Sequence, residues 1–133
     1  MGFAEQLTFT NERNAFMRHC GIRLTRLEPG LCRAELDSAD YCRNTGDTIH
    51  GGLLYTMADC AVSAYARAVG GRPVTLSGDF HYLANVTEGR IAAEARLSHL
   101  GRTIQVYSVQ VKCGGKLLAE GTFTCFRKDG EQR

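Results

Sequence analysis

A short polar run and the carboxylate that follows it are the residues of this sequence best suited to chemistry. The run reads Asn44-Thr-Gly-Asp-Thr-Ile-His50-Gly51-Gly52, and Asp59 follows His50 by nine positions. The Gly-Gly pair opens an apolar segment, so its backbone N–H groups would lie at a helix N-terminus, where developing negative charge is stabilised. A carboxylate acts as a nucleophile or as a general base toward water. Attack on a carbonyl group uses both kinds of group.

The same residues also have purely structural interpretations. On a helical wheel Asp59 shares a stripe with Thr56, Ser63 and Arg67, which is equally typical of a polar edge facing solvent. His50, directly before a helix, is suited to capping it, and proton transfer is the rarer role for such a residue. A metal site of His50 and Asp59 is disfavoured, because a nine-residue spacing does not bring two ligands to one helix face.

Residues 51 to 69 are predicted to form one long buried helix. The segment reads GGLLYTMADCAVSAYARAV, is rich in Leu, Met and Ala, and contains two charges. A helix that is apolar on most sides is buried. Gly70 and Gly71 are expected to end it.

The rest of the chain predicts a short helix over residues 10 to 20, a hairpin and then four strands in a meander. Alternation places Val74, Leu76, Phe80 and Tyr82 on one face of the first meander strand. A change of phase predicts a bulge between residues 106 and 107. Gly114-Gly115 indicates a tight hairpin. The residues expected to point inward from the last strand are Leu117, Ala119, Phe123 and Cys125. The predicted strands are 22–27, 31–36, 74–82, 91–97, 102–112 and 116–126.

These elements indicate an α+β fold, in which an antiparallel sheet of about six strands wraps around one long central helix. A split β-α-β arrangement is disfavoured because one helix alone is long. A sandwich is disfavoured because the helix is too apolar to lie outside.

Composition limits the class of protein. With 133 residues, 44% of them hydrophobic, residues 1–133 are expected to form a single domain. The net charge of +2 comes from 16 basic and 14 acidic residues spread along the chain, which argues against nucleic-acid and membrane-surface binding. The N-terminus does not resemble a signal peptide, and Asp59 and Arg67 interrupt the longest apolar stretch. The six cysteines contain no C-x-x-C pair and are expected to be free thiols of a cytoplasmic protein.

The polar run, together with Asp59, resembles the active-site motif of hotdog-fold acyl-CoA thioesterases of the PaaI (phenylacetate-pathway) type. The resemblance covers residues 20 to 126. Its further matches are Leu54, Ala58, Ala61, Val74-Thr75, Tyr82-Leu83, Gly101-Arg102-Thr103 and Ala119-Glu120-Gly121.

The resemblance implies the hotdog fold and hydrolysis of an acyl-CoA with a medium-chain or aryl acyl group. It assigns the catalytic carboxylate to Asp59, as base or nucleophile, and the oxyanion-binding amide to Gly51 beside His50. Its polar helpers fall on Asn44 and Thr75. It implies no cofactor, since coenzyme A is part of the substrate.

Other contacts with the substrate are expected at Gly52, which permits close approach, and at Arg102, a candidate for a coenzyme A phosphate. An ordinary solvated turn residue is an equally good interpretation of Arg102. Weaker candidates for phosphate contacts are Lys112, Lys116, Arg127 and Lys128. Candidates for the lining of the acyl pocket are Tyr55, Tyr65 and Phe80.

The chain departs from the family pattern twice. Asp47 stands where relatives usually have Gly, which puts the shape of the Asn44 loop in question, and Asn85 stands where they often have Pro.

Helix geometry predicts a dimer. Gly51 and Asp59 would lie about 12 Å apart along one helix, whereas both must come within about 3 Å of one reacting group. An antiparallel second copy would place its Asp59 opposite the first Gly51, giving a homodimer with shared sites and paired edge strands. The resemblance also permits a tetramer.

Two other functions remain alternatives. One is an acyl-thioester dehydratase or hydratase on the same fold, which His50-Gly51-Gly52 argues against. The other is a non-catalytic acyl-CoA binding module, which would need an effector domain. Turnover as opposed to binding alone separates these functions.

Overall fold

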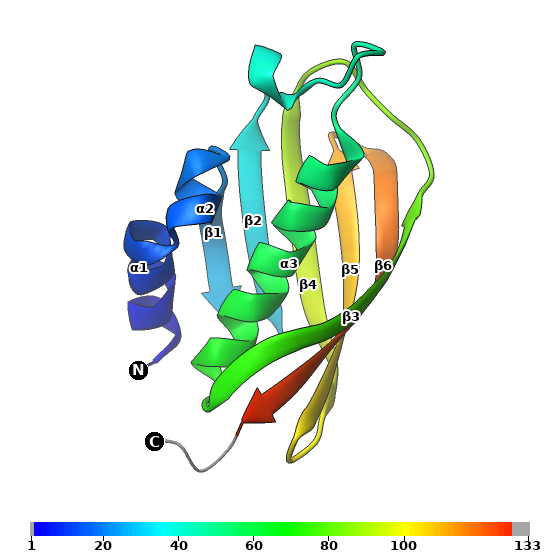
Figure 1. Cartoon of the computed structure of the whole chain (residues 1–133). Helices are drawn as coiled ribbons and strands as arrows, with labels where there is room; N and C mark the ends of the chain where they lie inside the picture. The colour runs from blue at the N-terminus through cyan, green and yellow to red at the C-terminus, as the bar shows by residue number, and fades with distance from the viewer. Residues whose placement is uncertain (1, 129–133) are drawn as a thin grey trace.

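The computed structural model describes residues 2–128 and contains one six-stranded antiparallel sheet with a long helix, α3, lying across one face (Figure 1). The strands follow the order β1-β2-β4-β5-β6-β3. This is the predicted α+β hotdog architecture. The elements are α1 (Phe3–Arg13), α2 (Ala15–His19), β1 (Arg23–Glu28), β2 (Leu31–Asp37), the 3-10 helix η1 (Asp40–Cys42), α3 (Gly51–Ala68), β3 (Arg72–Tyr82), β4 (Arg90–Leu100), β5 (Ile104–Cys113) and β6 (Lys116–Lys128).

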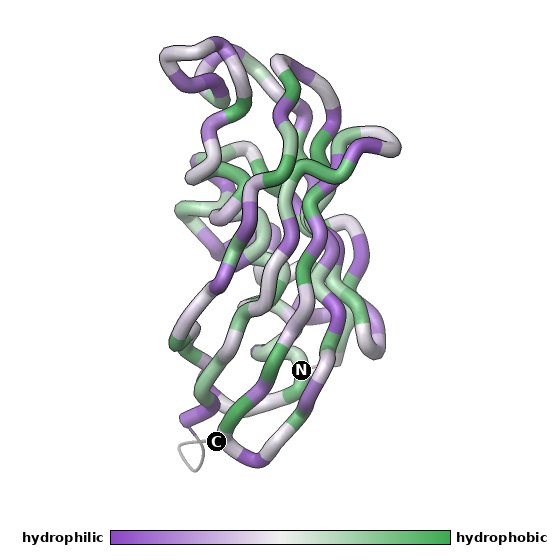
Figure 2. The backbone as a smooth tube through the Cα atoms, turned by 90° about the vertical axis from the view of Figure 1, so that its right-hand side faces the viewer, coloured by the Kyte–Doolittle hydropathy of each residue, from purple (hydrophilic) through white to green (hydrophobic). Residues whose placement is uncertain are grey.

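The core lies between α3 and the sheet. Small side chains such as Ala58, Ala61 and Ala66 are fully buried on α3, so the helix axis can approach the strands closely. Larger residues such as Met57 and Leu54 fill the remaining space. Along the strands, hydrophobic and hydrophilic residues alternate (Figure 2), which gives the sheet one core face and one outer face.

The N-terminal helix differs from its prediction. The structure has two helices, and the first begins seven residues before the predicted start. Asn14 separates them, because its side chain accepts a hydrogen bond of 3.1 Å from the backbone N–H of Met17 and so caps α2.

The predicted four-strand meander is wrong for its first strand. β4, β5 and β6 pair in sequence, but β3 pairs with β6 and forms one edge of the sheet, with β1 at the other edge. The predicted face of β3 is also wrong. Thr75 pairs with Cys125 and Ser77 with Thr124, so Leu76 is an extra, bulged residue. Beyond the bulge Phe80 packs against Tyr55 of α3, whereas Val74 before it lies on the opposite face and is 47% exposed.

The predicted irregularity at residues 106 and 107 is present, but the partner strand carries it. Leu97 pairs with Tyr107 and His99 with Val106, so the extra residue belongs to β4. β5 keeps one phase, with Gln105 fully buried beside Tyr107, whose hydroxyl donates to it.

A third bulge corrects the prediction for β6. The register shifts between Val111 and Lys112, so Leu118 is fully buried and Leu117 only partly buried. The other three residues predicted to point inward from β6 are buried, namely Ala119, Phe123 and Cys125.

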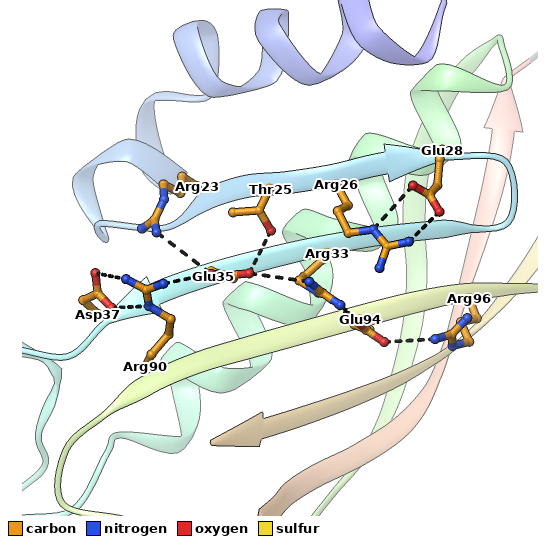
Figure 3. Close-up of polar contacts among 10 residues, drawn as sticks. All are labelled: Arg23, Thr25, Arg26, Glu28, Arg33, Glu35, Asp37, Arg90, Glu94 and Arg96. Carbon is orange, nitrogen blue, oxygen red and sulfur yellow. Dashed lines mark hydrogen bonds and ion pairs between the residues drawn. The ribbon is translucent and has the colours of Figure 1, made fainter. Parts of the chain in front are cut away.

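The outer face of β1, β2 and β4 carries a network of ion pairs (Figure 3). Arg33 donates to Glu94 at 2.8 Å, and Glu35 has three arginine side chains within 3.9 Å. This face of the sheet is polar, and the apolar core lies on the opposite side, under α3.

All six cysteines are free thiols, as predicted, and four of them are buried. Among residues 2–128, no helix has the length and apolarity needed to cross a membrane.

Candidate active site

The N-terminus of α3 presents one unused backbone donor. The Nδ1 atom of His50, the N-cap residue, accepts a hydrogen bond of 2.9 Å from the Gly52 N–H. The N–H of Gly51 finds no acceptor within residues 2–128. Because Nδ1 accepts, the neutral imidazole carries its proton on Nε2. The predicted pair His50 and Gly51 is therefore arranged as an anion-binding helix start, with the Gly52 N–H engaged by the cap.

Tyr82, at the end of β3, holds this helix start in place. Its hydroxyl donates a hydrogen bond of 3.0 Å to the Gly51 carbonyl oxygen. A Cβ atom at position 51 would lie 3.2 Å from the Tyr82 ring, so the close approach favours glycine. Burial, followed by the neighbouring Tyr55, raises the pKa of Tyr82, which keeps its hydroxyl a donor. The sequence predicts Tyr82 on an apolar strand face and matches it to the family, but it does not assign Tyr82 to the site.

Asp59 and Thr75, two residues that the family resemblance assigns to the site, are in contact. The Thr75 hydroxyl donates a hydrogen bond of 2.7 Å to Oδ1 of Asp59. Asp59 is half-buried on the polar stripe of α3, and Thr75 reaches it from β3. This bond leaves Oδ2 of Asp59 available to a water or a carbonyl carbon.

Two buried thiols lie close to Asp59 without competing with it. Burial, together with the Asp59 charge, raises the pKa of Cys60 to about 12. Burial likewise raises the pKa of Cys125, which pairs with Thr75 across the strands. Both thiols stay protonated at neutral pH, so the carboxylate is the nucleophile or base available here.

Asn44 shapes its own loop. Its Oδ1 accepts hydrogen bonds from the backbone N–H groups of Gly46, at 2.9 Å, and Thr48, at 3.2 Å. Asp47 in this loop has φ 65°, the left-handed conformation that favours glycine. Asp47 therefore holds the backbone conformation that glycine, the usual residue of the family at this position, adopts more readily.

The side chain of Arg127 is held by hydrogen bonds, whereas that of Arg102 is exposed to solvent. Arg102 is an exposed turn residue. The Arg127 guanidinium donates to the carbonyl oxygens of Val69, Gly101 and Arg102 at 3.0 to 3.4 Å. Arg127 therefore joins the C-terminus of α3 to the Arg102 turn.

The three aromatic residues expected around the acyl pocket do not lie together. Tyr65 is 4% exposed, and its hydroxyl accepts from the Gly30 N–H at 2.8 Å, so it is a core residue and that prediction is wrong. Tyr55 and Phe80 pack edge-to-face against each other and also contact Phe123.

The structure groups the predicted residues into two half-sites. One half-site holds His50, Gly51 and Gly52, and the other holds Asp59 and Thr75. Within one chain the two are separated by eight residues of continuous helix, or about 12 Å. Among residues 2–128, no cluster of three His, Cys, Asp or Glu side chains is placed to hold a metal ion.

Comparison with known proteins identifies the family. The model of the thioesterase superfamily matches residues 46–120, more than half of the chain. The chain belongs to the thioesterase superfamily. The match includes Gly51, Asp59, Thr75 and Arg102, while Asn44 lies just before it.

Individual relatives agree with this family. The proofreading thioesterase EntH of Klebsiella pneumoniae subsp. pneumoniae is 28% identical over 120 residues, which are 84% of this chain and 86% of that protein. A mutant of the phenylacetic acid degradation protein PaaI from Thermus thermophilus is 32% identical, with a TM-score of 0.81, covering 85% of this chain and 98% of that one. Conserved protein PA5202 from Pseudomonas aeruginosa is 29% identical, with a TM-score of 0.83, covering 92% and 97%. This thioesterase-family chain is therefore a hotdog-fold hydrolase with PaaI proteins among its structural neighbours.

Proposed function

We propose that the protein hydrolyses an acyl-CoA thioester, with a medium-chain or aryl acyl group, to the free acid and coenzyme A. The observation that carries the proposal is the pair of half-sites on α3: an unused Gly51 N–H at the helix start and an Asp59 carboxylate held by Thr75. The six free thiols favour a reducing compartment such as the cytoplasm.

The chemistry needs both half-sites. Asp59 takes a proton from a water that attacks the thioester carbonyl carbon, or attacks that carbon itself and is released by water in a second step. In either route negative charge develops on the carbonyl oxygen, where the Gly51 N–H and the dipole of α3 stabilise it. The C–S bond breaks, and the thiolate of coenzyme A leaves and takes up a proton.

The edge strand β3 supports a shared site in a homodimer. It carries a residue of each half-site, since Thr75 contacts Asp59 and Tyr82 contacts Gly51. If two copies of β3 pair antiparallel about a two-fold axis at Asp79, with the bulged Leu76 left out of the register as it is against β6, Thr75 comes opposite the partner's Tyr82. Asp59 then faces the partner's Gly51, as the chemistry requires.

The exposure of β3 also favours this dimer. Val74, Leu76 and Tyr82 are 47%, 56% and 51% exposed along an open edge of eleven residues. Such an apolar, unpaired edge is a surface that proteins normally cover. Pairs of such dimers would give the tetramer that the family resemblance permits.

Release of free thiol from a panel of acyl-CoAs tests the reaction. Asp59→Asn should lower the rate about 10² to 10⁴-fold, because the carboxylate is lost while its shape is kept. Glu12→Gln also replaces a carboxylate by an amide, at an exposed position on α1, and is the matched control. Binding of acyl-CoA without turnover by the wild type would favour the binding module, and full activity of Asp59→Asn would refute the assignment.

A mixed dimer tests the sharing of the site. Gly51→Pro removes the oxyanion N–H at a position where proline suits a helix, and His50 already has the extended ψ of 128° that a following proline requires. Gly51→Pro and Asp59→Asn homodimers should both be inactive. Co-expression should restore about one quarter of wild-type activity, since half of the dimers are mixed and one of their two sites is intact. Because a Cβ at position 51 lies 3.2 Å from the Tyr82 ring, circular dichroism and light scattering first establish that Gly51→Pro folds and assembles. No restoration by assembled mixed dimers would then refute the shared site.

A further inference from the structure

An open hollow of about 390 Å³ lies where α2, η1 and the first turns of α3 meet. Its walls include Phe16 from α2, Tyr41 and Cys42 from η1, and Leu53 and Thr56 from α3. In Figure 1 these elements lie on the side of α3 away from β3. The volume falls within the range of small-molecule sites, about 300 to 1,000 Å³.

Two exposed aromatic side chains line the hollow, beside the polar side chains of His19, His50 and Thr56. Phe16 and Tyr41 are 62% and 60% exposed. The Tyr41 hydroxyl is already engaged, because it donates a hydrogen bond of 2.6 Å to the Cys20 carbonyl oxygen. The ring is thereby fixed, and the Tyr41 side chain offers the hollow an apolar surface rather than a free hydroxyl. An apolar ligand would cover both rings.

The hollow borders the oxyanion half-site. His50 and Gly52, the two neighbours of Gly51, are themselves among its lining residues. A thioester whose carbonyl oxygen is bound by the Gly51 N–H therefore has its substituents next to this opening. The pantetheine arm carries two amide groups that need polar partners, whereas an acyl group needs apolar walls, so the lining favours the acyl group.

We propose that this hollow is the acyl-binding pocket and that Phe16 and Thr56 determine which acyl groups the protein accepts. Its occupant is a medium-length alkyl chain or an aryl ring. The inference rests on the proposed function for the position of the thioester, but Phe16, Tyr41 and Leu53 stood outside the residues that the sequence assigned to the site.

Two substitutions change the hollow in opposite ways. Phe16→Ala removes an exposed wall at little expected cost to folding, and Thr56→Phe fills the hollow from α3. Phe126→Ala, on the outer face of the sheet and 36% exposed, is the matched aromatic control. Circular dichroism and light scattering establish that each variant keeps its fold and assembly.

Calorimetric affinities for coenzyme A, acetyl-CoA, hexanoyl-CoA and phenylacetyl-CoA, measured in the Asp59→Asn background, test the proposal without requiring turnover. Both hollow variants should bind hexanoyl-CoA and phenylacetyl-CoA about tenfold more weakly, with coenzyme A and acetyl-CoA changed less than about twofold. The control should match the parent for all four ligands.

Three results would overturn the pocket. The hollow variants could weaken the binding of all four ligands equally, which would place pantetheine there, or they could leave every affinity unchanged. The third is that the parent binds hexanoyl-CoA and phenylacetyl-CoA no more tightly than coenzyme A. Turnover by the wild type is measured separately. The wild type could hydrolyse none of these thioesters while Phe16→Ala still weakens the binding of hexanoyl-CoA and phenylacetyl-CoA. In that case the pocket stands and the proposed function fails.

Discussion

The hydroxyl of Thr75 donates a hydrogen bond of 2.7 Å to Oδ1 of Asp59, which ties the edge strand β3 to the middle of α3. One carboxylate oxygen is thus held while the other is left for chemistry. Because the bond comes from the strand expected to pair in a dimer, assembly and orientation of the carboxylate are linked.

Replacing Thr75 should impair the reaction step. Thr75→Val keeps the shape but removes the donor, so Asp59 loses its orientation and kcat should fall about tenfold or more with little change in KM. Thr75→Ser keeps the hydroxyl and should retain most of the activity. Steady-state kinetics on one acyl-CoA distinguish the two, with Thr122→Val, an exposed position on β6, as control. Equal activity of the Val and Ser variants would contradict the orienting role.

His50 is predicted to act through the helix start. His50→Ala leaves the Gly52 N–H without its 2.9 Å acceptor, so the free energy of unfolding should fall by about 1 kcal/mol. The loosened Gly51 donor should also lower kcat. His50→Asn restores a capping side chain and should recover both stability and rate. Urea unfolding together with thiol-release kinetics measures this, and a stable His50→Asn variant without activity would instead indicate a direct contact of His50 with substrate.

Asp47 offers a test of backbone geometry. A non-glycine residue at φ 65° is strained, although less so for Asp than for most residues. The free energy of unfolding of Asp47→Gly should therefore equal that of the wild type or exceed it by up to about 0.5 kcal/mol. That of Asp47→Ala should be lower than the wild type's by about 1 kcal/mol. The pair with Arg43, 4.0 Å away at an exposed position, adds little. Thermal unfolding gives the order, and equal stability of the Ala and Gly variants would show that this loop stores no strain.

Local patterns predicted the elements that depend on local chemistry. The apolar run from Gly51 and the Pro29-Gly30 turn fix their own structure, and α3 and the β1–β2 hairpin lie where expected. The position of β3 depends instead on which strand it pairs with after α3 has crossed the sheet. Alternation along β3 carries no information on that choice, and the bulge at Leu76 reverses the faces that alternation predicts.

The site was predictable to a similar extent. A motif assigns Asp59, Thr75, His50 and Gly51 to the proposed site. The structure joins Thr75 to Asp59 by a hydrogen bond and places His50 and Gly51 at the start of α3. Tyr82 was not predicted as a site residue, because the alternation of a strand does not show which group the tyrosine hydroxyl will contact. In the structure that group is the Gly51 carbonyl oxygen. The hollow beside Gly51 was missed because its walls come from separate segments of the chain.

Stability toward acid should depend on the network of the outer face. Burial alone raises the pKa of Glu94, but the hydrogen bond and charge of Arg33, aided by Arg96, outweigh it and hold that pKa below its usual value (Figure 3). As the pH falls below about 4.3, the unfolded chain protonates Glu94 before the folded chain does. The stabilisation from this carboxylate is therefore present above that pH and is lost as the pH falls toward the folded-state pKa.

Glu94→Gln should accordingly be less stable than the wild type at pH 7, and the difference should shrink between about pH 4.5 and pH 3. Arg33→Gln should show the same narrowing, since it removes the partner of the same ion pair. Urea unfolding at a series of pH values measures both, with Glu120→Gln as control because Glu120 has no ion pair within residues 2–128. A stability difference for Glu94→Gln that stays constant across this range would mean that packing of the side chain, rather than its charge, is what the network contributes.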